Sequence, residues 1–264
     1  MTGRARLVPI PGAAALLLVP PADRPEPRTV LVADVHLGLG SSPAHPDGPP
    51  GAAGPQLAEQ LIGIAERSGA ASLVIAGDAK DPIPMVPRAL RGPLFAFFSD
   101  LLRAGLSVDV ILGNHDGGLA PHLPREVTVV PATGLVRAGV GIFHGHRWPS
   151  PQVLRCRQWV AGHLHPGVRL APTPESPTGK QRCWVRVAFR RPPPAVPGRP
   201  WGAESMVVLP AFNPIAGTEA LNRQRPARGR TLLYHRFLAH GIARAYLLDG
   251  TDLGPLPIGG RTAR

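Results

Sequence analysis

TVLVADVHLG, residues 29–38, joins a short apolar run rich in β-branched residues directly to two candidate metal ligands, Asp34 and His36. The same arrangement returns in SLVIAGDAKD, residues 72–81, and in VDVILGNHD, residues 108–116. Between these runs, apolar residues at helical spacing predict helices over 55–68 and 87–104. Short apolar runs that alternate with helices are typical of βαβ units, so we expect a parallel sheet with strands at 29–33, 72–76 and 108–112.

The pattern changes after residue 125, where helical spacing fades and short strands follow one another. We predict these strands at 127–130, 140–144, 158–161, 184–189, 206–209 and 243–248. Prolines and a glycine interrupt the apolar segment 7–19, which favours a pair of N-terminal strands over a secretory signal. We expect a single domain over residues 1–264, with a Pro-rich loop insertion at 166–200 and a flexible tail at 255–264.

Composition narrows the class of protein. The 264 residues suffice for a buried core, and no apolar run is long enough to cross a bilayer, so we expect no membrane partner. The formal net charge of +12 lies entirely in residues 151–264, and all but two of the basic residues are arginine. Arginine forms bidentate pairs with phosphate, so this half fits a polyanionic partner. Cys156 and Cys183 are too few for a disulfide framework, and we expect reduced thiols in a cytoplasmic protein.

A polar cluster follows each of five predicted strands, and ligands of open α/β sheets bind beyond the carboxyl ends of strands. The clusters are Asp34/His36, Asp78/Asp81, Asn114/His115/Asp116, His144/His146 and His163/His165. In an extended segment, residues i and i+2 point to the same side about 6.6 Å apart, so Asp34/His36 and His163/His165 could each aim two donors at one dinuclear centre. Glycines before three of the clusters (Gly77, Gly113 and Gly162) permit the sharp turn from strand to loop.

The donor set indicates the metal. Imidazole, carboxylate and amide oxygen without a thiolate favour Mn²⁺, with Fe or Zn²⁺ as alternatives. Two such ions about 3.5–4 Å apart can polarise a phosphoryl group and supply a hydroxide for in-line attack.

The ordered series DxH, GDxxD, GNHD, His and GHxH over residues 29–166 resembles the calcineurin-like binuclear metallophosphoesterase superfamily. ADVHLGLG, the HGH at 144–146, GHLHP and LPAFNPIAG at 209–217 resemble its SbcD-related branch, which includes the ligase-associated DNA damage response endonuclease PdeM. Many members of that branch read GDxKH in the second motif, where this chain has Asp81 after Lys80. The resemblance implies an α/β fold, a four-layer αββα metallophosphoesterase sandwich with two mixed β-sheets.

The resemblance also implies roles for these residues. Two divalent ions would be held by Asp34, His36 and His165 at the first position, by Asn114, His144 and His163 at the second, and by Asp78 as the bridge. His115 would be the general acid or electrophile toward the leaving oxygen, Asp116 would orient its imidazole, and a metal-bridging hydroxide would be the nucleophile. We expect Asp81 to hold a ligand histidine or the loop. His146 is either a substrate contact or, as we prefer, a support for the ligands.

Two arginine-rich segments are candidate substrate contacts. Residues 182–190 alternate Arg182, Trp184 and Arg186 with apolar residues, which predicts a half-buried strand whose other face is either solvated or a ledge for a nucleic-acid backbone. In the second reading Trp184 could stack on a base and Arg186 contact phosphate. RQRPARGR, residues 223–230, is a solvated loop or a rim of the site that includes Arg223 and Arg225.

The sequence therefore predicts a metal-dependent hydrolase of phosphodiester bonds, acting on nucleic acid, with DNA as the first choice, in a repair-associated nuclease role. A phosphatase or phosphodiesterase of small nucleotides is the alternative within the same class, because the metal motifs serve both. A non-catalytic scaffold for a helicase or an ATP-dependent ligase is the alternative from another class.

Overall fold

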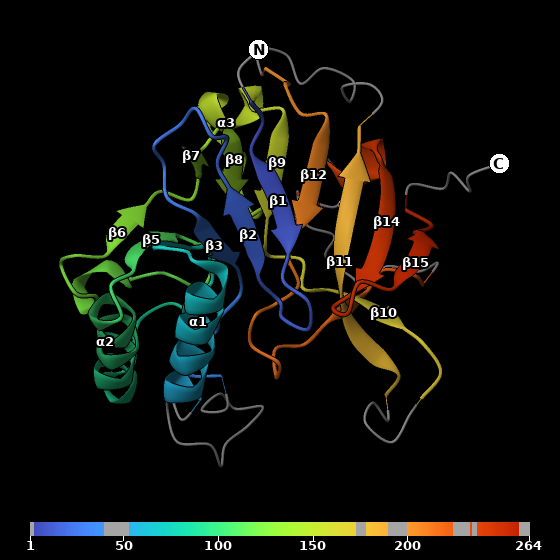
Figure 1. Cartoon of the computed structure of the whole chain (residues 1–264). Helices are drawn as coiled ribbons and strands as arrows, with labels where there is room; N and C mark the ends of the chain where they lie inside the picture. The colour runs from blue at the N-terminus through green and yellow to red at the C-terminus, as the bar shows by residue number, and fades with distance from the viewer. Residues whose placement is uncertain are drawn as a thin grey trace.

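Two β-sheets lie face to face in the computed structural model, which describes residues 3–39, 53–172, 178–189, 200–223, 233 and 237–258 (Figure 1). The first sheet has the order β1-β2-β3-β4-β5-β6, and its strands β3 to β6 are parallel. These strands are β1 (Arg6–Pro9), β2 (Leu16–Val19), β3 (Thr29–Val32), β4 (Ser72–Ile75), β5 (Ser107–Ile111) and β6 (Thr128–Val130). The predicted parallel strands and the N-terminal strand pair are thus confirmed.

Two helices cover the outer face of the first sheet, α1 (Gly54–Ser68) and α2 (Arg88–Arg103) (Figure 1). Both agree with the predicted helices to within one residue at each end. Helix α1 ends at Gly69, whose left-handed backbone (φ 58°) lets its N–H reach back to the last carbonyls of the helix. The apolar faces of the two helices pack on Val30, Val32, Ile75 and neighbouring residues in one buried cluster.

The second sheet has nine strands in the described part of the chain, with the path β13-β10-β11-β12-β9-β8-β7 and β14 and β15 added beside β11. They are β7 (Leu135–Arg137), β8 (Val140–Phe143), β9 (Gln158–Ala161), β10 (Pro166–Arg169), β11 (Lys180–Ala188), β12 (Ser205–Val208), β13 (Glu219–Ala220), β14 (Ile242–Leu247) and β15 (Asp252–Pro255). β8, β9 and β12 run parallel, whereas β7, β11, β14 and β15 pair antiparallel. Both sheets are therefore mixed, as predicted.

Three apolar clusters correspond to the three interfaces of a four-layer sandwich. One lies between the helices and the first sheet, and a second, with Leu31, Val74, Ile142 and Val160, lies between the two sheets. The third covers the outer face of the second sheet. In the part of the chain that the structure describes, this outermost layer is thin, with α3 (Pro151–Arg155), the 3₁₀ turn Leu238–His240 and Leu233.

Two predicted irregular segments contain more structure than expected. The stretch 166–200 was predicted to be a loop insertion, but most of its described residues belong to strands β10 and β11; residues 173–177 and 190–199 lie outside the described residues. The predicted tail 255–264 begins with buried residues, because Leu256 and Ile258 pack in the outer apolar cluster; residues 259–264 are not described. Strand β10 pairs with the next strand, β11, and with β13, which lies more than fifty residues further along the chain.

Among the described helices, none combines the length and the apolar composition that crossing a membrane would require.

Candidate metal centre

Five loops carry the predicted ligands, and each loop follows a strand: β3, β4 and β5 of the first sheet and β8 and β9 of the second. The expected extended geometry of the i, i+2 pairs is wrong. The strands end before the ligands, and the backbone turns into the left-handed region at Asp34 (φ 58°), His36 (φ 44°), Asp78 (φ 51°), His163 (φ 71°) and His165 (φ 44°). Non-glycine residues in this region are strained, and such strain concentrates at functional sites.

Asp34, His36 and His165 form the first cluster, in which one ligand atom of each lies within 4.8 Å of the others. His36 Nε2 lies 3.1 Å from His165 Nε2, and His165 Nε2 lies 3.4 Å from Asp34 Oδ1. Two imidazole nitrogens and a carboxylate oxygen that face a common point form a typical binding site for a divalent cation. This trio is the set predicted for the first metal.

Asp78, His144 and His163 form the second cluster. His144 Nε2 lies 3.2 Å from both Asp78 Oδ2 and Asn114 Oδ1, so the amide joins the same group. Asp78 Oδ2 also lies 3.9 Å from His36 Nε2, which places this carboxylate between the two clusters. The structure thus brings all seven predicted metal ligands together.

Backbone carbonyls fix the orientation of two ligand imidazoles. His144 Nδ1 lies 2.8 Å from Ala76 O, and His165 Nδ1 lies 2.9 Å from Gly217 O. A carbonyl only accepts hydrogen bonds, so each Nδ1 carries the proton and each Nε2 is left as the ligand atom. His36 Nδ1 lies 3.2 Å from the Asp81 carboxylate, the position expected of a residue that holds a ligand histidine. Such outer partners accompany metal-binding histidines.

At the buried ligands, burial and neighbouring opposite charges shift the pKa values in opposite directions. Burial favours the neutral acid of Asp34, but the charge and hydrogen bond of His165 and the charge of His144 outweigh it and lower the pKa of Asp34. Asp78 behaves likewise: the hydrogen bond and charge of His144 overcome burial, and the pKa of Asp78 lies far below its usual value. Burial would lower the pKa of His144, yet the hydrogen bond and charge of Asp78 raise it to about 9. The metal-free site is therefore an ion-paired network that a cation can enter in exchange for protons.

His146 lies beside the second cluster without belonging to it. Its ring centroid is 5.2 Å from that of His144 and 6.0 Å from that of His163. Burial, followed by the charge of His144, lowers the pKa values of both His146 and His163 to about 4. Both imidazoles are thus neutral at pH 7, the form in which histidine binds a metal.

His115 borders the site with its Nε2 turned inward. Its Nδ1 lies 2.5 Å from the Asp81 backbone oxygen, its backbone N–H donates to Asp78 Oδ1 (2.8 Å), and its Nε2 lies 4.0 Å from Asp78 Oδ2. The Asp81 carbonyl therefore fixes the tautomer. His115 also forms a third group of close ligand atoms with His36 and Asp81, which overlaps the first cluster.

Asp116 does not have the predicted position against the His115 imidazole. Its carboxylate accepts from the backbone N–H groups of Lys80 (3.2 Å) and Gly113 (2.8 Å). Asp116 thus ties the loop after β5 to the loop after β4. Burial, together with the charge of Asp78, raises the pKa of Asp116. The adjacency of His115 and Asp116 in sequence suggested a pair, but the turn at this position points the two side chains to different partners.

Two supporting residues had no predicted role. Lys80 is completely buried, and its ammonium donates to the backbone oxygens of Pro82 and His115. Asn213 is 1% exposed, and its amide donates to Val35 O (3.0 Å), inside the Asp34–His36 turn. The sequence pointed to them only indirectly. Lys80 is one of two lysines in an arginine-rich chain, and Asn213 lies in the LPAFNPIAG motif on which the family resemblance partly rests.

The three glycines before the ligand clusters were predicted to permit a sharp turn. For Gly113 and Gly162 the better explanation is that neighbouring atoms lie too close to leave room for a Cβ. Only Gly77 has a positive φ (93°). A Cβ at Gly113 would collide with the Asp78 carboxylate, and a Cβ at Gly162 would lie 2.5 Å from Ala33 Cβ on the opposite sheet. Gly162 therefore permits the two sheets to meet where the ligands converge.

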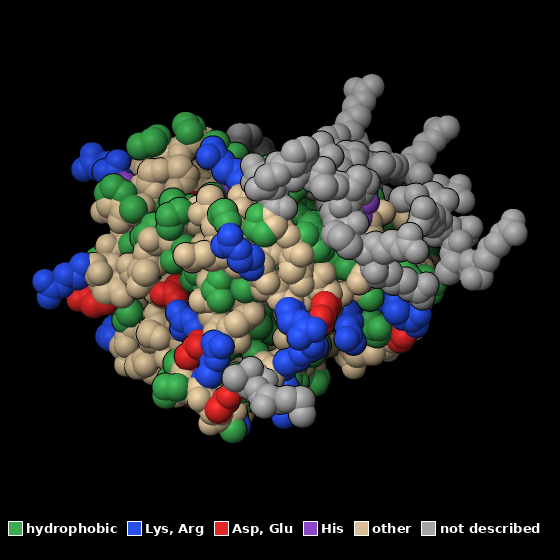
Figure 2. All heavy atoms as spheres, turned by 90° about the horizontal axis from the view of Figure 1, so that it is seen from above, with side chains coloured by type: hydrophobic (Ala, Val, Ile, Leu, Met, Phe, Trp, Pro, Cys, Tyr) green, Lys and Arg blue, Asp and Glu red, His purple; other side chains and the backbone are tan. Residues whose placement is uncertain are grey.

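Within the described residues, no arginine candidate has a hydrogen bond or ion pair with a candidate metal ligand. Arg186 is exposed on β11, Arg223 is exposed, and Arg225 is not described. Trp184 is 3% exposed and packs between the sheets, so the prediction that it could stack on a base is wrong. Arg182 donates to the carbonyls of residues 211 and 212. On the face in Figure 2, Lys and Arg side chains are scattered rather than gathered in one patch.

Comparisons with known proteins give one informative similarity. No family model matches the chain, and no curated protein matches it. Among solved structures, the chain resembles the Pseudomonas putida nuclease MPE with a TM-score of 0.52 and 20% identity over 94% of this chain and 100% of that one. It resembles YfcE, a phosphoesterase from E. coli, with a TM-score of 0.41 and 16% identity over 87% of this chain and 98% of that one, too distant to support a conclusion. The first similarity and the two mixed sheets identify the fold as a metallophosphoesterase fold.

Proposed function

We propose that the protein is a hydrolase of phosphodiester bonds that uses two divalent metal ions, with Mn²⁺ as the first choice. The observation that carries the proposal is the convergence of Asp34, Asp78 and four imidazoles in two adjoining groups of ligand atoms. The fold and its similarity to a nuclease support the same reaction class.

The residues present fit such a metal pair. Asp34, His36 and His165 would hold one ion, Asn114, His144 and His163 the other, and Asp78 both. The donors are carboxylate, amide and imidazole, and both cysteines lie outside the clusters. When bound, two such ions polarise the phosphoryl group and supply the nucleophile at neutral pH.

His115 would give a proton to the leaving oxygen. Its Nδ1–H is held by the Asp81 carbonyl, so a second proton on Nε2 faces the site. The side chain is partly exposed, unlike His144, and can therefore reach a substrate. Asp116 and Lys80 would position His115 through the backbone of its loop. We retain His146 as a support for the second cluster.

Two observations support a phosphodiester of nucleic acid as the substrate. They are the similarity to a nuclease and the net positive charge of residues 151–264. DNA, a role in repair, a ligase or helicase partner, a cytoplasmic location and the single-domain organisation remain predictions.

The test compares bis-p-nitrophenyl phosphate with p-nitrophenyl phosphate in the presence of Mn²⁺. We expect faster turnover of the diester and a loss of about 10²-fold or more in His115→Ala, since general acid catalysis contributes that much. His122→Ala, which changes a histidine of the 3₁₀ turn Ala120–His122, is the matched control and should retain activity.

Preference for the monoester would favour the small-nucleotide phosphatase. Absence of hydrolysis in both the parent protein and His115→Ala would favour the scaffold and overturn the proposal.

A further inference from the structure

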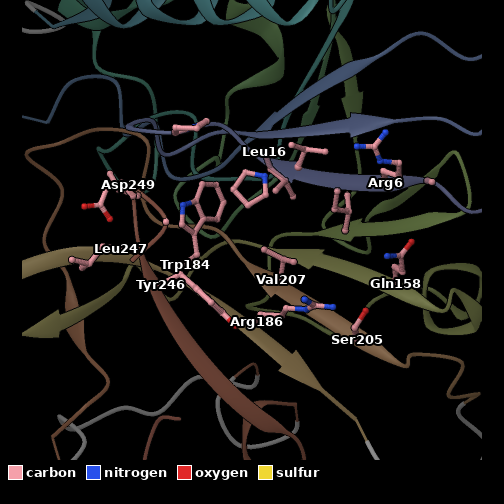
Figure 3. A pocket seen from close by; sticks show the side chains of 17 residues that line it. Arg6, Leu16, Gln158, Trp184, Arg186, Ser205, Val207, Tyr246, Leu247 and Asp249 are labelled. Atoms are coloured by element: carbon pink, nitrogen blue, oxygen red, sulfur yellow. The ribbon is translucent and has the colours of Figure 1, made fainter. Parts of the chain in front are cut away.

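A second cavity lies between the sheets, separate from the metal clusters. Its volume is about 640 Å³, within the range typical of small-molecule sites. Strand β1 forms one wall, and β11, β12 and β14 form the other (Figure 3). None of the candidate metal ligands lines it. Gln158, at one end of the cavity, is the first residue of β9, whereas the ligands His163 and His165 follow the last residue of that strand.

The cavity follows from the unequal widths of the two sheets. The first sheet ends at β1, but the second continues from β12 to β11, β14 and β15. Inward side chains of β11 and β14 therefore extend beyond the cover of the first sheet. Trp184 and Tyr246 are direct cross-strand neighbours there and supply two aromatic rings to the lining. Apolar atoms form most of the cavity surface, as in sites that hold an aromatic ligand.

Two arginines flank one end of the cavity. Arg6 comes from β1 and Arg186 from β11, on opposite walls, with the neighbouring pair Gln158 and Ser205 at the same end (Figure 3). Within the described residues, neither arginine has an ion-pair partner.

Other arginines of this region are paired with acids. Arg4 and Arg157 both contact Glu204, and Arg244 contacts Asp252. Two unpaired guanidinium groups, an amide and a hydroxyl at the same end supply the kinds of donor that bind a phosphate.

The other end of the cavity carries a carboxylate, Asp249, beside Gly250 (Figure 3). Between the two ends, the indole Nε1 of Trp184 is buried without a hydrogen-bond partner among the described residues. Because this nitrogen is also inaccessible to solvent, Asp249 is the polar group that a ligand can reach at this end.

We propose that this cavity binds a nucleoside monophosphate. The phosphate would lie between Arg6 and Arg186, the planar base against the half-buried ring of Tyr246, and a hydroxyl or amino group would donate to Asp249. A simple fatty acid would leave the Tyr246 ring without a stacking partner and Asp249 without a donor, and inorganic phosphate would leave most of the cavity unfilled. The proposal is independent of the proposed function, because binding requires neither metal ion nor catalysis.

Titration calorimetry of the metal-free protein with adenosine 5′-monophosphate tests the proposal. We expect saturable binding with one ligand per chain. Arg186→Gln and Arg6→Gln should each weaken it about tenfold or more, the effect of one charge-assisted contact. Arg157→Gln, which changes an ion-paired arginine next to Gln158, is the matched control and should bind within about twofold of the parent protein. Adenosine and inorganic phosphate alone should each bind at least about tenfold more weakly.

Asp78→Asn locates the bound nucleotide, because it alters the metal centre and leaves the cavity intact. Unchanged binding in this variant, with loss in Arg186→Gln, supports the second site. Absence of binding by the folded parent protein, equal effects of Arg186→Gln and Arg157→Gln, or loss of binding in Asp78→Asn would each overturn the proposal. A circular dichroism spectrum of each variant confirms that it is folded.

Discussion

The two sheets contribute different chemistry to the metal centre. Loops of the first sheet supply both ligand carboxylates, Asp34 and Asp78, together with His36 and Asn114. Loops of the second sheet supply only imidazoles, His144, His163 and His165, to the candidate ligand set.

Backbone hydrogen bonds join the ligand-bearing loops within each sheet, whereas contacts of the ligand side chains join one sheet to the other. Loops of the first sheet are tied to one another through the backbone: Asp34 N–H donates to Gly77 O (3.0 Å), and His36 N–H donates to Asp78 O (2.9 Å). Loops of the second sheet are joined in the same way, since Gly162 N–H donates to His144 O (2.9 Å). They attach to the first sheet through ligand groups, as when His163 N–H donates to the Asp34 carboxylate (3.0 Å). The acids thus have a rigid frame, and the imidazoles reach them only when the sheets pack. The site is a product of the interface between the sheets.

The largest expected effect comes from removing a charge on the first-sheet side. Asp78→Asn should lower diester turnover by about 10³-fold or more and reduce the metal content, because this carboxylate faces both clusters. Elemental analysis of the purified protein and steady-state kinetics measure the two effects. Asp109→Asn, on strand β5 with its partner Arg137, should keep its metal. Full metal content in Asp78→Asn would contradict the bridging position.

A smaller effect should follow from forcing the sheets apart. In Gly162→Ala the new Cβ would lie 2.5 Å from Ala33 Cβ, so overpacking should lower the free energy of unfolding by about 1–3 kcal/mol and weaken Mn²⁺ binding. Denaturant unfolding and metal titration measure both.

Gly92→Ala in helix α2 is the control, since nothing lies within 4 Å of its added Cβ. It should bind Mn²⁺ normally and change stability by no more than about 1 kcal/mol. Equal metal affinity in the two alanine variants would show that packing at the interface does not set the site.

Removing a support within the first sheet should separate positioning of His115 from metal binding. Lys80→Met deletes the ammonium that donates to the His115 and Pro82 carbonyls, which lowers the free energy of unfolding by about 1–3 kcal/mol. Diester turnover should fall about tenfold while metal content stays constant, because Lys80 is absent from both ligand clusters. Retained turnover, or loss of metal in the folded variant, would contradict this role.

The smallest effect concerns the pH dependence of the metal-free protein. The pKa of His144 is raised to about 9, so its contribution to stability is complete below pH 6.5 and is lost as pH rises toward 9. The pKa values of His146 and His163 are lowered to about 4, so their contribution is complete above pH 6.5 and is lost as pH falls toward 4. Thermal unfolding without metal should therefore show a maximum near pH 6.5.

His144→Asn should flatten the alkaline side of that profile and weaken the acid side without abolishing it, because burial, the larger cause of the lowered pKa values of His146 and His163, remains. Saturating Mn²⁺ should also remove the alkaline decline, since a metal-bound imidazole carries no proton at the ligand atom. An unchanged alkaline decline in His144→Asn would show that another group titrates there.

The sequence predicted the first sheet well and the second sheet less completely. Strands β3, β4 and β5 alternate with helices α1 and α2, so each has a local pattern of its own. Strands β10 and β13, by contrast, pair across more than fifty residues of sequence, and their local patterns carry little information.

For the site, the residue types indicated a metal centre and the structure brings them together. Their orientation was not predictable, because it depends on left-handed turns at Asp34 and Asp78 and on supports such as Asn213. The partner of Asp116 was mispredicted for the same reason: proximity in sequence does not determine where a turn points a side chain.

Anomalous diffraction from crystals soaked in Mn²⁺ tests the central claim most directly. We expect two peaks, one among Asp34, His36 and His165 and the other among Asp78, His144 and His163. A single peak, or manganese bound elsewhere while these side chains stay paired with one another, would contradict the account.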